Sequence, residues 1–223
     1  TARPKGMMRV GTLNVRRTLG SGSDVEGGFR TVDVLMDMME ELDMAFLCVQ
    51  EPECSLGHLR GMLRAGFKAY GAAEGAKVLW IGRGSWAALV RARGLDDDGR
   101  ICVLRLAGLR NDKQILVGYY GVSGSNTDAV ALTKHERYLA AGEALSDGQM
   151  LLGRQLVWAG DFNMALRMTD GENVRSACPD RFRKFVDGLH LDSAFVRKHP
   201  HITRHDGAYT FHRDGMQTSL INV

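Results

Sequence analysis

Hydrophobic residues in this chain lie mainly in short blocks, and most of these blocks end on a polar residue. Such blocks are typical of buried strands. They predict strands at 7–15, 44–50, 77–82, 85–92, 100–108, 114–122 and 155–159, with a final pair at 208–212 and 217–223. Turns rich in Gly, Asp and Asn separate several of them, which indicates antiparallel neighbours.

Longer stretches carry apolar residues three and four positions apart, the spacing of an amphipathic helix. Helices are expected at Phe29–Leu42, at Leu56–Ala65 after an N-cap at Ser55, at 127–152, and from Pro179 to Leu189. Residues 16–28 are rich in Gly, Ser and Arg and are expected to form a loop. The helices do not alternate regularly with the strands as in a Rossmann fold. The pattern therefore favours a layered α/β sandwich in one domain.

Composition excludes some classes of protein. The chain has 223 residues with 44% hydrophobic and 25% charged positions, and no apolar run approaches the roughly 18 residues of a membrane span or looks like a signal peptide. The four cysteines form no CxxC pair, so neither a zinc site nor a disulfide framework is indicated. A reducing compartment fits this cysteine pattern.

The net charge of +3 is small, but it is unevenly distributed. Residues 1–30 carry six Lys and Arg against two acids, and residues 181–213 carry seven against three together with five of the seven histidines. A positive face for nucleic acid is one interpretation. An unevenly charged, solvated surface is the other.

Polar side chains that finish apolar strands are the candidates for chemistry. They are Asn14, Glu51, Tyr120, Asp161 with Asn163, and Ser219 with Asn222. Carboxylate and amide oxygens are hard ligands that suit Mg²⁺, which takes few protein carboxylates and keeps waters and phosphate oxygens. Structural roles are also open: a turn at Asn14, a solvent-exposed strand end at Glu51, a core aromatic at Tyr120, and an Asx-turn from Asp161 to Asn163.

Five segments, in this order, resemble the endonuclease/exonuclease/phosphatase superfamily: TLNVRR, AFLCVQEP, VGYYGV, VWAGDFN and AYTF with TSLIN. The resemblance is greatest to the endonuclease domains of non-LTR retrotransposons and their apurinic-endonuclease relatives, and it spans Met7 to Val223. It implies a four-layered α/β sandwich, with two facing mixed or antiparallel sheets flanked by helices, as a single domain over residues 1–223.

The resemblance also implies roles in the Mg²⁺-assisted (or Mn²⁺-assisted) hydrolysis of a phosphodiester. Glu51 and Asn14 match the family's metal-ligand glutamate and its amide, and Asp161 lies toward the metal or the attacking water, which it orients or deprotonates. Tyr120 matches the phosphate-contacting tyrosine, and Asn163 the amide that supports the phosphate. The implied activity is DNA nicking in the nucleus, with RNA as a possible substrate and no membrane partner. Phosphate contacts are expected from Arg16, Arg17, Arg30, Arg183 and Lys184.

The match departs from the family at its end. Where the family has an aspartate that supports a catalytic histidine, this chain has Asn222, three residues after Ser219, and an amide supplies no negative charge to an imidazolium. The family's final SDH strand is absent. Either the natural polypeptide continues, or the chain has lost its base and serves as a structural or nucleic-acid-binding subunit with protein partners. A phosphatase acting on a lipid or small phosphoester is a third hypothesis, although no aromatic membrane loop supports it.

Overall fold

The structure, a computed structural model, describes residues 8–16, 19, 25–107, 114–123, 128–151, 155–163, 179–189, 211–213 and 216–219. The chain divides into two compact units. The first unit comprises Thr1–Tyr120 and Gly153–Gly160, and the second comprises Gly121–Leu152 and Asp161–Val223.

The first sheet belongs to the first unit and is mixed. Its strands are β1 (Val10–Asn14), β2 (Phe46–Gln50), β3 (Phe67–Gly71) and β4 (Val78–Arg83), in the order β1-β2-β4-β3. Strands β1 and β2 are parallel, with Asn14 opposite Gln50, and the other pairs are antiparallel. Because β1 and β2 are parallel, their carboxyl ends lie side by side at the same end of the sheet.

The second sheet contains β5 (Val90–Leu95), β6 (Ile101–Leu106), β7 (Gln114–Tyr120) and β8 (Gln155–Asp161), in that order, with β5–β6 and β6–β7 antiparallel. The two sheets share a core to which the first contributes Phe46, Cys48 and Trp80 and the second Cys102, Leu104 and Leu116. The indole Nε1 of Trp80 donates to the carbonyl oxygen of Cys102 at 2.9 Å. The prediction of two facing sheets is therefore confirmed.

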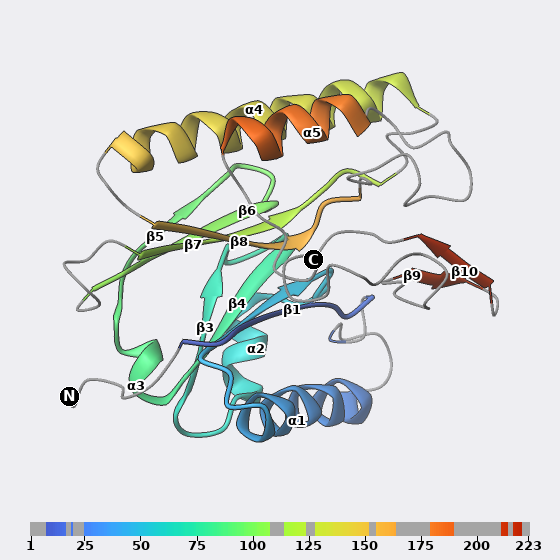
Figure 1. Cartoon of the computed structure of the whole chain (residues 1–223). Coiled ribbons are helices and arrows are strands. Elements are labelled where there is room, and N and C mark those ends of the chain that lie inside the picture. The colour runs from blue at the N-terminus through green and yellow to red at the C-terminus, as the bar shows by residue number, and fades with distance from the viewer. Residues whose placement is uncertain are drawn as a thin grey trace. The chain divides into compact units, whose positions relative to one another are not determined.

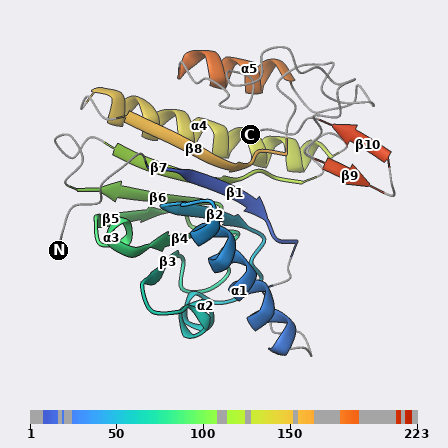
Figure 2. The same ribbon diagram turned by 60° about the horizontal axis from the view of Figure 1, so that its bottom comes forward.

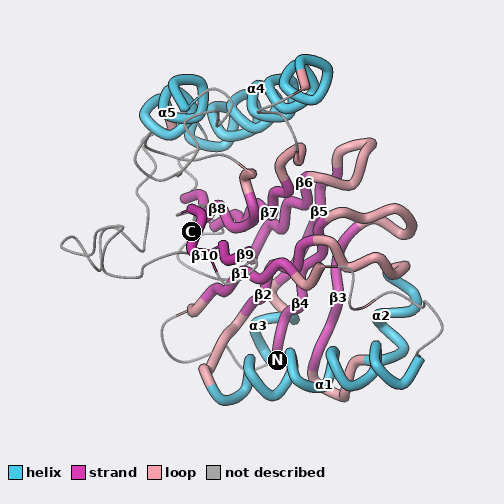
Figure 3. The backbone as a smooth tube through the Cα atoms, turned by 90° about the vertical axis from the view of Figure 1, so that its right-hand side faces the viewer, coloured by secondary structure: helices cyan, strands magenta, loops and turns pink. Residues whose placement is uncertain are grey.

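Helices α1 (Val25–Glu41) and α2 (Leu56–Met62) lie along one side of the first sheet (Figures 1 and 3). The buried face of α1 packs with apolar side chains of β2 and β4 in a second core: Val32, Leu35, Met36, Met39, Leu47, Val49, Leu79 and Ile81. Helix α2 begins as predicted, because the Ser55 hydroxyl accepts from the His58 N–H at 3.1 Å.

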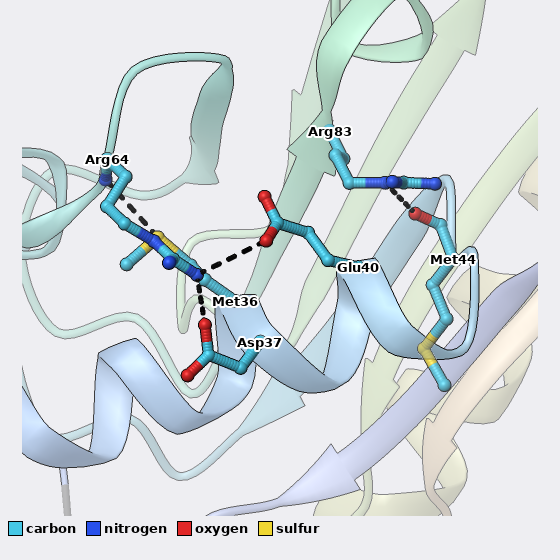
Figure 4. A network of polar contacts seen from close by, with 6 residues as sticks. All are labelled: Met36, Asp37, Glu40, Met44, Arg64 and Arg83. Carbon is cyan, nitrogen blue, oxygen red and sulfur yellow. Dashed lines mark hydrogen bonds and ion pairs between the residues drawn. The ribbon is translucent and has the colours of Figure 1, made fainter.

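Two arginines fasten the end of α1 to its surroundings (Figure 4). The Arg64 guanidinium, beyond α2, donates to the Asp37 carboxylate at 2.6 Å and lies 3.8 Å from Glu40. Arg83, at the end of β4, donates to the Met44 carbonyl oxygen at 2.9 Å and pairs with Asp43. These ion pairs are exposed or partly exposed, so each contributes little to stability.

The second unit contains α4 (Ala129–Leu151), α5 (Pro179–Gly188), β9 (Phe211–Arg213) and β10 (Met216–Ser219). The two helices pack on each other, and β9 and β10 form an antiparallel pair (Figure 2). Among the described residues, no helix is long and apolar enough to cross a membrane.

The predicted elements differ most from the structure in three places. Gly84–Ala87 is the short helix α3, so β5 begins at Val90 and not at 85; the Tyr70 hydroxyl donates to the last carbonyl of α3 at 2.6 Å. Strand β3 was missed because only two of its five residues, Phe67 and Ala69, carry buried apolar side chains. Two such residues are too few to stand out as a hydrophobic block. Helix α1 begins at Val25, inside the predicted loop, although two adjacent glycines lower the helix propensity of its first turns.

Candidate active site

Three of the predicted site residues meet in the first unit. Asn14 ends β1, Glu51 follows the last residue of β2, and Tyr120 ends β7. One carboxylate oxygen of Glu51, Oε1, accepts from Asn14 Nδ2 at 2.8 Å and from the Tyr120 hydroxyl at 2.7 Å. Two strands of one sheet and one strand of the other thus deliver an acid, an amide and a phenol to the same place.

The backbone around these side chains is held in an uncommon conformation. Glu51 has φ 50° and Arg16 has φ 47°, both in the left-handed region that side-chain-bearing residues avoid. The Arg16 N–H donates to Asn14 Oδ1 at 2.9 Å, and the Glu51 N–H donates to the Lys77 carbonyl oxygen at 3.0 Å. Strain held by the surrounding structure is a common feature of functional sites.

A buried polar side chain supports the end of β2. Gln50 is 1% exposed. Its amide nitrogen, Nε2, donates to the Thr12 hydroxyl at 3.0 Å and to the Cys48 carbonyl oxygen at 3.1 Å. Burial raises the pKa of the neighbouring Cys48 thiol, which therefore stays neutral. These contacts anchor Gln50, the last residue of β2, directly before Glu51.

Asp161 and Asn163 lie in the second unit and are linked by a hydrogen bond. Asp161 Oδ1 accepts from the Asn163 N–H at 2.9 Å, and Asn163, with φ 51°, donates from Nδ2 to the Gly121 carbonyl oxygen at 3.1 Å. This is the Asx-type turn that the sequence left open, and it orients both side chains. Phe162 between them is buried and packs against Phe185 of α5, with ring centroids 6.2 Å apart.

Glycines permit the close backbone contacts beside these two groups. At Gly160, with φ 150°, an added Cβ would lie 1.8 Å from the Tyr119 carbonyl oxygen. At Gly121 it would lie 2.0 Å from the Phe162 carbonyl oxygen and 3.0 Å from His135, which is fully buried in α4. The glycine in GDF is thus required by backbone packing.

The remaining predicted residues are only partly described. Arg16 and Lys184 are exposed, as expected of phosphate-binding side chains. Arg30 lies in α1, Arg183 in α5 and Ser219 at the end of β10. Arg17 and Asn222 lie outside the described residues.

Two residues beside the site were not selected from the sequence. Gln50 was visible as a polar residue inside a continuous apolar run. Arg100, whose guanidinium carbon lies 5.1 Å from the centroid of the Tyr120 ring, follows Gly99 in a turn and carries no sequence signal of its own.

The donor atoms of the first unit fit a hard divalent cation. Among the described residues, no three His, Cys, Asp or Glu side chains are grouped to hold a metal. Mg²⁺ and Mn²⁺ need fewer, because water and substrate oxygens complete their shells. The Glu51 carboxylate and the Asn14 amide oxygen are ligands of the right kind.

The two-sheet sandwich has the fold of the endonuclease/exonuclease/phosphatase superfamily. Among solved structures, the chain is similar to an AP endonuclease from Archaeoglobus fulgidus, with TM-score 0.67 and 17% identity over 97% of this chain and 85% of that one. It is similar to the 3'-5' exonuclease NExo from Neisseria meningitidis, with TM-score 0.69 and 16% identity over 96% and 85%.

A further similar structure is the catalytic domain of APE2 from Xenopus laevis, with TM-score 0.67 and 14% identity over 96% of this chain and 81% of that one. No protein-family model matches the sequence, and neither does any curated protein. At these identities the likeness establishes the fold, and the chemistry has to be argued from the residues.

Proposed function

We propose that this chain is a divalent-metal-dependent phosphodiesterase that nicks DNA. The observation that carries the proposal is the double hydrogen bond to Glu51 Oε1 from Asn14 and Tyr120. A carboxylate held by two donors at the ends of three strands has a fixed direction, as a metal ligand requires.

Glu51 and Asn14 would hold Mg²⁺ or Mn²⁺. The bound cation would supply Lewis acidity toward a phosphoryl oxygen and the leaving oxygen. The Tyr120 hydroxyl donates its single proton to the Glu51 carboxylate and so orients it. When substrate binds, that proton would turn to a phosphate oxygen. Asn14 holds the same carboxylate from the other side, and its own oxygen is steadied by the Arg16 N–H.

Asp161 and Asn163 complete the proposal. The Asx-type turn fixes the Asp161 carboxylate for orienting or deprotonating a water. The hydrogen bond to the Gly121 carbonyl oxygen fixes the Asn163 amide for a phosphoryl oxygen. This role requires that the two units form one domain in which Asp161 also reaches the metal. That convergence is part of the proposal.

DNA is the proposed substrate. The similar structures include an AP endonuclease and a 3' phosphatase, NExo from Neisseria, bound to a product DNA hairpin. The exposed side chains of Arg16 and Lys184 would contact phosphates, and such contacts position a duplex without reading its sequence.

A plasmid assay tests the activity. Supercoiled DNA, untreated or partly depurinated, is incubated with the protein in Mg²⁺, in Mn²⁺ or in EDTA, and open circles are counted. We expect nicking with either metal and none in EDTA. Glu51→Gln and Asp161→Ala should each lower the rate by about 10²-fold or more.

Lys68→Ala is the matched control, since Lys68 is an exposed side chain of β3 and has no role in the proposed site. Equal nicking by wild type and Asp161→Ala would indicate a contaminating nuclease. No nicking by folded wild type on either DNA would contradict the proposal and favour the non-catalytic subunit.

Convergence on one metal is tested separately. Mn²⁺ is paramagnetic and broadens the NMR signals of nearby amides, so the Asp161 and Asn163 N–H signals should broaden on Mn²⁺ addition. Glu51→Gln should abolish this effect. Broadening confined to residues near Glu51 would show that Asp161 lies away from the metal.

A further inference from the structure

A turn of the second sheet lies against Tyr120. Arg100 lies between β5 and β6, and its guanidinium covers the Tyr120 ring at 5.1 Å from the centroid. Its Nη1 donates to the Tyr120 carbonyl oxygen at 3.2 Å, and the Tyr120 N–H donates to the Arg100 carbonyl oxygen at 2.9 Å. One residue therefore contacts Tyr120 at its N–H, its carbonyl oxygen and its ring face.

The same turn is also linked to the backbone of Glu51. The Glu51 N–H donates to the Lys77 carbonyl oxygen at 3.0 Å, and the Lys77 N–H donates to the Gly99 carbonyl oxygen at 2.8 Å. Gly99 has φ 65°, and a Cβ there would lie 3.0 Å from Ala76 Cα, so the turn is closely packed. Two backbone hydrogen bonds thus join Glu51, at the end of β2, to the turn that carries Arg100.

Together these contacts form a closed circuit. It runs from Glu51 through Lys77 and Gly99 to Arg100 and then to Tyr120. The Tyr120 hydroxyl, 2.7 Å from Glu51 Oε1, completes it. Tyr120 is 7% exposed, so its ring has little freedom once the guanidinium covers one face. A guanidinium stacks well on an aromatic face because it is planar and weakly hydrated.

We infer that Arg100 is a positioning residue of this site. It holds the Tyr120 hydroxyl on Glu51 and keeps the end of β7 beside the end of β2. The consequence for catalysis rests on the proposed phosphodiesterase function. The consequence for the placement of Tyr120 does not.

Arg93 provides a matched control. Its guanidinium also donates to a backbone carbonyl oxygen, that of Gly71, at 2.8 Å, but it does not contact the site. Arg100→Met removes the arginine–carbonyl hydrogen bond to Tyr120, and Arg93→Met removes the one to Gly71. The first substitution also uncovers the Tyr120 ring.

The first measurement is independent of activity. The protein is labelled with ring-¹³C tyrosine, and the Tyr120 signal is assigned by its absence in Tyr120→Phe. We expect this signal to shift in Arg100→Met, to shift less in Arg100→Lys, and to stay unchanged in Arg93→Met. If Arg100→Met does not fold, Arg100→Gln takes its place in the comparison. An unchanged Tyr120 signal overturns the inference, whatever the activity.

The second measurement is the nicking rate in Mg²⁺. Because small misplacements of a catalytic group can slow a reaction by up to about 10²-fold, we expect Arg100→Met to lower kcat by about tenfold with KM changed less than about threefold. Arg100→Lys, which keeps the charge, should recover most of this loss. In Tyr120→Phe, adding Arg100→Met should have little further effect, because the arginine acts through the tyrosine.

The two proposals fail in distinguishable ways. If the wild type nicks no DNA but the Tyr120 signal still shifts in Arg100→Met, the proposed function fails and the positioning role stands. If Arg100→Met retains wild-type kcat, or its effect multiplies fully with that of Tyr120→Phe, the positioning role fails while the activity stands.

Discussion

The left-handed backbone at Glu51 leads us to predict how glycine and alanine at this position differ in stability. Both Glu51→Gly and Glu51→Ala remove the carboxylate that Asn14 and Tyr120 contact, so both lose the same two hydrogen bonds. They differ only in the backbone. Alanine must occupy φ 50° with a Cβ, whereas glycine adopts this region without a steric penalty.

The expected difference follows from two opposing terms. A left-handed residue with a Cβ costs about 1–2 kcal/mol, which only the alanine variant bears. Glycine loses more conformational entropy on folding, about 0.5–1 kcal/mol. We therefore expect Glu51→Gly to be more stable than Glu51→Ala by up to about 1.5 kcal/mol, with about 0.75 kcal/mol at the middle of both ranges. Both should be less stable than wild type by about 1–3 kcal/mol from the lost hydrogen bonds.

Urea unfolding followed by circular dichroism measures the difference, with equal m-values as the check that the denatured states are comparable. Arg137, an exposed residue inside α4, is the control position. There the order should reverse, and Arg137→Ala should be more stable than Arg137→Gly by about 1 kcal/mol.

Alanine equal to or better than glycine at position 51 would refute the reasoning. Glu51 would then not be held in the left-handed region, and its carboxylate direction could not be set by the backbone. The expected reversal would show that the site retains a strained residue where glycine would be more comfortable, because a carboxylate is needed there.

Three further outcomes are expected. Gly160→Ala should destabilise the protein by roughly 1–3 kcal/mol, because the new Cβ would lie 1.8 Å from a backbone carbonyl oxygen. Gly61→Ala in α2 should stabilise it by about 0.5–1 kcal/mol, because nothing lies within 4 Å of the new Cβ. Thermal unfolding compares the two variants. Burial raises the pKa of the Asp96 carboxyl from 3.8, and its Oδ2 has no hydrogen-bond partner in the part of the chain that is described. The folded state therefore binds this proton more tightly than the unfolded state, so the unfolding free energy should rise as pH falls through the raised pKa toward 3.8, and Asp96→Asn should remove that contribution in pH-dependent urea unfolding. Mg²⁺ at about 100 times its dissociation constant should raise the unfolding free energy by about 2.7 kcal/mol in wild type and by much less in Glu51→Gln, and EDTA should reverse the gain.

DNA binding should also depend strongly on salt if the proposed phosphate contacts form. Affinity measured by fluorescence anisotropy in Ca²⁺ should fall steeply between 50 and 200 mM salt. Arg16→Ala should make the dependence shallower, whereas Arg91→Ala, on the exposed edge strand β5, should not. A flat response in wild type would count against a DNA-binding surface.

Local pattern was enough for much of the fold. The apolar blocks that became β2, β4, β6 and β7 are buried almost throughout, so their hydrophobicity alone marked them as strands. The periodic face of α1 and the Ser55 cap of α2 were equally readable. Strand β3 was not, because its few apolar residues become a strand only by pairing with β4.

The candidate site divides in the same way. The sequence by itself determined which polar residues finish apolar strands, since a polar group after a buried run stands out without any structure: Asn14, Glu51, Tyr120 and Asp161. Only the tertiary structure decided that Asn14 and Tyr120 both donate to one oxygen of Glu51 and that Arg100 covers the Tyr120 ring. These contacts join residues 20 to 69 positions apart, and pairing at such distances depends on sheet register and packing, which no local pattern encodes.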